Sequence, residues 1–145
     1  MTPTMRGRWF TRLFLTGVIG VPVTLFYMLM FGAFSADGAG VAKMPLLVVW
    51  MTVLGLALDP AYYALQTLRW DRDWPMAFHI AAGLLEGILT FTLFALGALP
   101  GADCVEGDGG RFIVHYGSMF LLMVAMLWGP MRVLFPKWRF RGGVP

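Results

Sequence analysis

The chain has 145 residues, of which 59% are hydrophobic and only 13% are charged. An average soluble domain has roughly 45–50% apolar and about 25% charged residues. A chain this short cannot hide so much apolar surface in its own core, because small domains keep much of their surface exposed. The composition argues against a water-soluble domain and predicts a single membrane domain that covers residues 1–145.

The net charge of +3 does not indicate a nucleic-acid partner, because of where the charges stand. They lie at the ends of apolar runs, where basic residues orient membrane spans. A domain that follows phosphates would gather them on one soluble face. We therefore expect no nucleic acid and take the lipid bilayer as the first partner.

Four apolar runs are long enough to cross a bilayer, which takes about 20 helical residues. In chain order they cover residues 13–34, 44–68, 75–99 and 112–135. The segments between them are rich in glycine, proline or charge, as connecting loops are. The sequence predicts an all-α bundle of four transmembrane helices, with kinks at the intramembrane residues Pro22, Pro60 and Pro130.

Basic residues fix the expected orientation, because they are enriched in cytoplasmic loops. Nine of the eleven flank the cytoplasmic side of this scheme, and only Lys43 and Arg111 fall on the other. The nine are Arg6, Arg8, Arg12, Arg69, Arg72, Arg132, Lys137, Arg139 and Arg141. We predict a multi-pass protein of the cell membrane with both termini in the cytoplasm and with Cys104 outside.

Ionisable residues inside the predicted spans are costly and mark candidate sites. At a rise of about 1.5 Å per residue, Asp59 and Glu86 both lie roughly 15 Å from the cytoplasmic boundary, on consecutive antiparallel helices. His79 lies seven residues before Glu86 and so on the same helical face. Arg132 enters the fourth span from the same side, near the depth of His79. The sequence predicts a polar cluster of these four residues.

This cluster has two interpretations that the sequence leaves open. It can be an internal network that fixes the packing of the helices. It can also be a path for protons, because two acids at one depth do not both ionise cheaply and a histidine could relay a proton. We rank the structural interpretation first.

Sequence motifs for catalysis and cofactors are absent. There is no nucleophile elbow, phosphate loop or metalloprotease helix, and the single cysteine offers no metal spacing. His79 and His115 fall near opposite faces of the membrane, too far apart to share one haem. We expect no enzyme activity, no metal and no cofactor.

Small residues and one loop indicate interaction surfaces. Gly83 and Gly87 form a GxxxG pattern, and Gly17 and Gly20 add small positions where helices can approach closely. The second loop alternates charge between two tryptophans, and Trp and Arg dominate binding hot spots. This candidate cytoplasmic docking loop consists of Arg69, Trp70, Asp71, Arg72, Asp73 and Trp74.

Together these features predict a non-catalytic structural subunit that assembles with itself or with a larger membrane complex. The alternative is a small oligomeric channel, or a proton- or cation-coupled transporter that uses Asp59 and Glu86. The two differ in whether water reaches the acids.

Overall fold

A computed structural model describes residues 4–34, 39–102, 104 and 107–139, and side chains within 4–30, 43–102, 104 and 107–137. Arg141, predicted to be cytoplasmic, lies outside this part. Every regular element of the described residues is helical. In chain order these are α1 (Met5–Leu15), the π-helical turn η1 (Thr16–Gly20), α2 (Val21–Phe34), α3 (Ala39–Leu68), α4 (Met76–Ala95), α5 (Asp108–Trp128), α6 (Pro130–Leu134) and the 3-10 turn η2 (Pro136–Arg139).

Four stretches of the described helices are long and apolar enough to cross a membrane, as the sequence predicted. They are Met5–Met30, Lys43–Leu68, Met76–Ala95 and Asp108–Leu134. The first helix begins eight residues before the predicted start at 13. The reason is local, because the Thr4 side chain accepts a hydrogen bond from the Gly7 amide and caps a helix that already carries the basic residues.

The helices predicted at residues 75–99 and 112–135 also have different ends from those predicted. Helix α4 ends at Ala95 rather than at 99, and Gly97 follows it with a φ of +64°. Helix α5 begins at Asp108, directly after Gly107 with a φ of +90°. Glycine adopts this left-handed conformation without steric cost, so these two positions end one helix and start the next.

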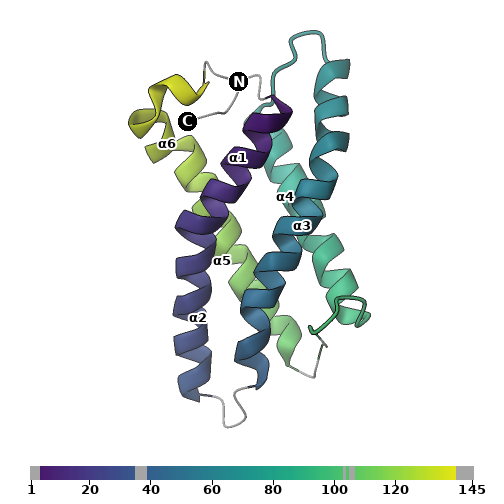
Figure 1. Cartoon of the computed structure of the whole chain (residues 1–145), viewed down its shortest axis with the longest axis vertical. Coiled ribbons are helices and arrows are strands. Elements are labelled where there is room, and N and C mark those ends of the chain that lie inside the picture. Colours follow the sequence, from purple (N-terminus) through teal and green to yellow (C-terminus); the bar gives the residue numbers. More distant parts are fainter. Residues whose placement is uncertain (1–3, 35–38, 103, 105–106, 140–145) are drawn as a thin grey trace.

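Successive long helical stretches run in opposite directions along the long axis of the bundle (Figure 1). The start of α1, the α3–α4 connection and η2 lie at one end, which we call the terminal end. The end of α2, the start of α3, the end of α4 and the start of α5 lie at the opposite end. The segments that hold most of the basic residues therefore share one end of the bundle.

The three prolines predicted to kink spans stand in different local structures. Pro22 is the second residue of α2 and comes just after the π-helical turn η1. Proline has no backbone N–H to donate to the preceding turn, and the wider π-helical turn accommodates the loss of that hydrogen bond. Helix α3 continues without interruption through Pro60. Pro130 opens α6 after Gly129, where the last long helix is interrupted. A bend of the helix axis at these positions stays a prediction.

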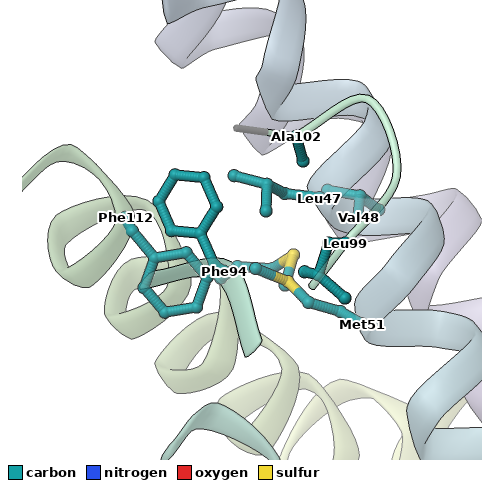
Figure 2. Packing of buried hydrophobic residues seen from close by; sticks show 8 residues of the cluster. Leu47, Val48, Met51, Phe94, Leu99, Ala102 and Phe112 are labelled. Carbon is teal, nitrogen blue, oxygen red and sulfur yellow. The ribbon is translucent and has the colours of Figure 1, made fainter. Parts of the chain in front are cut away.

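An apolar cluster packs the bundle towards the opposite end (Figure 2). It joins α3, α4, the α4–α5 connection and α5. Its buried members are Leu47, Val48, Met51, Phe94, Leu99, Ala102, Phe112 and Met119. Phe94 and Ala102 are almost fully enclosed, at 1% and 0% exposed. Polar side chains flank this cluster as well, since Lys43 at the start of α3 pairs with Asp108 at the start of α5 at 3.2 Å.

Candidate functional site

An arginine of the first helix joins two acids of two other helices. Arg12 Nε and Nη2 donate to the carboxylate oxygens of Asp59 at 3.1 and 2.9 Å. Its Nη1 and Nη2 donate to the carboxylate oxygens of Glu86 at 2.8 and 2.9 Å. The side chains of Arg12, Asp59 and Glu86 are 22%, 3% and 12% exposed. We call these three residues the ion triad, and it ties α1, α3 and α4 together.

The backbone around the triad is shaped to receive the guanidinium. Gly55 lies one turn before Asp59 on α3, and a Cβ there would collide with the guanidinium of Arg12. Arginine presents its donors in a planar fork that matches a carboxylate on each side. Gly55 therefore leaves the space in which one arginine can bind both acids.

A second arginine stands one turn before Arg12 on the same face of α1. Arg8 Nη2 donates to the side-chain oxygen of Gln66 at 2.6 Å. Its guanidinium carbon lies 4.2 Å from the centre of a Trp74 ring. Its Nε is buried and has no hydrogen-bond partner within the described part of the chain, and no acid described there lies within ion-pair distance. Arg8 is thus a partly buried cation without a carboxylate of its own.

A cavity of about 180 Å³ lies between α1, α3, α4 and α5. The ion triad and Arg8 line it, with Tyr62, Trp74 and His79. Farther along it is apolar and reaches Val48, Met51 and Met119 of the buried cluster, the first two of which Figure 2 shows. Tyr116, Phe120, Met123 and Leu127 of α5 contribute the facing wall. The cavity is therefore lined by both charged and apolar side chains.

The four residues of the predicted polar cluster do not share one contact. Asp59 and Glu86 meet across Arg12. His79 lines the same cavity, and its ring lies 6.2 Å from Trp74 and 6.0 Å from Trp128. The guanidinium of Arg132 stacks over the Trp128 ring at 3.9 Å and does not line the cavity. The arginine that contacts both acids is Arg12, which the predicted cluster did not include.

His115 lies away from this site, on the α5 face towards α2. It is fully buried, and its Nε2 is 3.1 Å from the Thr24 hydroxyl. Its ring packs edge-on against Tyr27. His79 and His115 stand in different environments, and the described residues hold no group of three or more His, Cys, Asp or Glu side chains that could bind a metal.

Three of the four predicted packing glycines contact a neighbouring helix of the same chain. A Cβ at Gly83 would collide with Phe120, and one at Gly87 with Tyr116. The Tyr116 hydroxyl also donates to the Gly83 carbonyl. Gly20 lies against Met119 and Met123. The GxxxG pattern thus serves the α4–α5 contact within one chain, whereas Gly17 faces open space.

The predicted docking loop has an inner and an outer part. Trp74 is only 4% exposed and packs against Tyr62 and Phe78, so it belongs to the interior rather than to a docking surface. Trp70 is 94% exposed. Between them Arg69 binds Asp71 through two hydrogen bonds at 3.0 and 2.9 Å.

The backbone of this loop is tied to α3 and to itself. Gln66 donates its side-chain amide to the carbonyl of Arg72, whose φ of 50° is unusual for a residue other than glycine. The Asp73 amide donates to the carboxylate of Asp71 at 3.2 Å. Trp70 is therefore displayed on an internally braced turn.

Sequence reasoning missed Arg8 and Arg12 as parts of the site because it placed them in the aqueous flank before a span that starts at 13. Their spacing held a usable signal. Residues four apart share a helical face, and these two arginines join directly onto an apolar run. Arg6 belongs to the same basic segment, and its side chain is exposed.

The arrangement can hold opposite charges out of water and enclose a small molecule beside them. It presents no nucleophile paired with a general base among the cavity residues. No protein-family model matches the chain, and neither a curated protein nor a solved structure matches it. Functional inference therefore starts from the ion triad and the cavity.

Proposed function

We propose that this chain is a four-span membrane protein with both termini in the cytoplasm, and that it acts as a non-catalytic subunit assembled with itself or with a larger membrane complex. The observation that carries this proposal is the ion triad. Both of its acids are hydrogen-bonded by an arginine of the same chain, which supports an internal structural role.

The physical basis is the cost of charge in lipid. An acid at the centre of a span costs about 2.5–3.5 kcal/mol on insertion scales. Two such acids are tolerated when one guanidinium gives each of them two hydrogen bonds, as Arg12 does. The triad thereby holds three helices in one relative position. This supports a scaffold more directly than it supports a mobile carrier.

The orientation rests on charge and on the shared end of the bundle. Eight of the eleven basic residues belong to described segments at or near the terminal end, and such residues are retained in the cytoplasm. Cys104 follows α4 towards the opposite end and is exposed. An impermeant thiol reagent should label Cys104 in intact cells. Labelling only after lysis would reverse the proposed orientation.

Assembly is favoured by surfaces that the bundle does not use internally. Trp70 is displayed at 94% exposure, and Gly17 leaves open space on the first helix. A small residue lets another helix approach closely. Extraction in a mild detergent, followed by mass measurement and identification of bound proteins, tests the assembly directly. A monomer with no bound protein would contradict it.

The role of Trp70 can be separated from the fold by a matched pair of variants. Trp70→Ala should weaken recovery of the assembly and leave the free energy of unfolding of the subunit unchanged, because the side chain is 94% exposed. Trp74→Ala should instead destabilise the subunit by about 3–5 kcal/mol, as for other buried aromatic residues. Assembly that survives Trp70→Ala would remove this loop from the interface.

A second candidate is a proton- or cation-coupled transporter, because the cavity touches both acids of the triad. Purified protein in liposomes would then carry protons or cations down an imposed gradient. Asp59→Asn and Glu86→Gln should abolish that flux while the variants stay folded. Absence of flux in the unmodified protein would leave the scaffold as the better account.

A further inference from the structure

The cavity beside the triad is large enough to hold a small organic molecule. Its volume is about 180 Å³, and an apolar cavity of about 150 Å³ binds benzene. Its lining includes methionine, leucine and aromatic side chains, among them Met119, Phe120 and Leu127, together with Arg8 and the triad. A molecule that fits this lining has a benzene-sized apolar body and one polar head.

The chemistry of the head group follows from the donors and acceptors that are already used. All four carboxylate oxygens of Asp59 and Glu86 accept from Arg12. Arg8, in contrast, lines the cavity and binds only a neutral amide and a tryptophan face, with no acid of the described residues within ion-pair distance. Arg8 is therefore the lining cation that a ligand can still pair with, and a carboxylate is the acceptor that an arginine binds best.

Charge balance adds a second requirement. With both acids ionised, the two arginines and two acids that line the cavity sum to zero. An added carboxylate would make the sum negative among partly buried side chains, which is costly. One proton removes that cost. Glu86 is its natural acceptor because it is more exposed than Asp59, at 12% against 3%.

Glu86 meets charged and titratable groups from each helix packed against it. Arg12 faces it from α1, Asp59 and Tyr62 from α3, and Tyr116 from α5. Once protonated on one oxygen, Glu86 still accepts from Arg12 through the other. The triad then has no net charge, and the positive charge of Arg8 balances the negative charge of the bound carboxylate.

We propose that this cavity binds a small apolar monocarboxylate at Arg8, together with one proton that passes from water to a carboxylate oxygen of Glu86. This goes beyond the scaffold role, since binding is a property of the single chain whether or not it assembles. A failed assembly experiment would leave it standing, and a failed binding experiment would leave the assembly standing.

The test compares three probes of one shape on the full chain, purified in a mild detergent. Benzoate carries the anion, benzylamine a cation and benzamide no charge. Calorimetric titration should show that benzoate binds at least about tenfold tighter than the other two, since a hydrogen-bonded charge is worth about that much. Equal binding of benzamide would mean that only size is recognised, and preference for benzylamine would mean that the acids select the ligand. Either result, or no binding of benzoate, overturns the proposal.

Variants assign the binding to Arg8. Arg8→Gln should weaken benzoate binding at least about tenfold. Arg6→Gln removes an exposed charge from the same helix and should leave binding unchanged. If Arg8→Gln does not fold, Arg8→Lys keeps the charge but loses the planar fork, and it should still bind more weakly than the unmodified chain. Unchanged affinity in the folded Arg8 variant would contradict the assignment.

Proton uptake is measured by repeating the titration in two buffers of different ionisation enthalpy. Each benzoate should bring about one proton, so affinity should rise as the pH falls. Glu86→Gln imitates the protonated acid and should bind benzoate without proton uptake. Uptake of no proton by the unmodified chain, or the same uptake by Glu86→Gln, would overturn the proton-linked part.

Discussion

Replacing Arg12 by glutamine is expected to destabilise the bundle more than any surface change. The variant leaves two carboxylates at 3% and 12% exposure without their counter-charge. Hydrogen bonds within membrane proteins average about 0.6 kcal/mol, so the four lost bonds account for roughly 2 kcal/mol. Breaking a buried ion pair costs about 3–5 kcal/mol because the remaining charge is uncompensated. We therefore expect Arg12→Gln to lower the free energy of unfolding by about 3–5 kcal/mol.

The assay is equilibrium unfolding in mixed micelles, followed by tryptophan fluorescence. Arg6→Gln is the matched control, since it removes the same charge from an exposed position of the same helix. The triple change Arg12→Met, Asp59→Asn and Glu86→Gln removes every charge of the triad and should recover much of the loss. If the free energies of unfolding of Arg12→Gln and Arg6→Gln agree within about 0.5 kcal/mol, the triad does not support the fold.

Two further predictions concern the space around the triad and the exposed turn. Gly55→Ala should destabilise the bundle by about 1–3 kcal/mol, because the new Cβ displaces the Arg12 guanidinium. Gly17→Ala meets open space and should be neutral or stabilising in the same unfolding assay, and equal effects would refute the clash. In the turn, hydrogen bonds from Arg69 lower the pKa of Asp71, so the contribution of this pair persists above the ordinary acid pKa and is lost as the pH falls through the lowered value. Arg69→Gln should raise the pKa of Asp71 in a carboxyl NMR titration, and an unchanged value would show that the pair does not form in solution.

The number and order of the helices were predictable because long apolar runs leave a strong mark on a sequence. Runs of about 20 apolar residues separated by glycine, proline and charge have few structural alternatives. The helix ends were less predictable. Helix α1 extends back to Met5 because a threonine cap and a turn of basic residues continue the helix, and hydropathy does not register them.

The acids of the site were also readable from sequence, since depth along two consecutive helices can be counted from residue numbers. Asp59 and Glu86 matched in depth, and they meet the same guanidinium. Which cation joins them was not readable. Arg12 and Arg132 both lie near the terminal end, and which of them contacts the two acids depends on how the helices rotate and pack.

By itself, the sequence determined that the chain forms four long apolar helices and which acids stand inside them, because composition and spacing are properties of one chain segment at a time. Only the tertiary structure decided that Arg12 reaches both acids and that Trp74 turns inward while Trp70 stays exposed. It also decided that Arg8 faces a cavity without an acid of its own. These outcomes depend on helix rotation and on the space left at Gly55, which contacts between distant segments set.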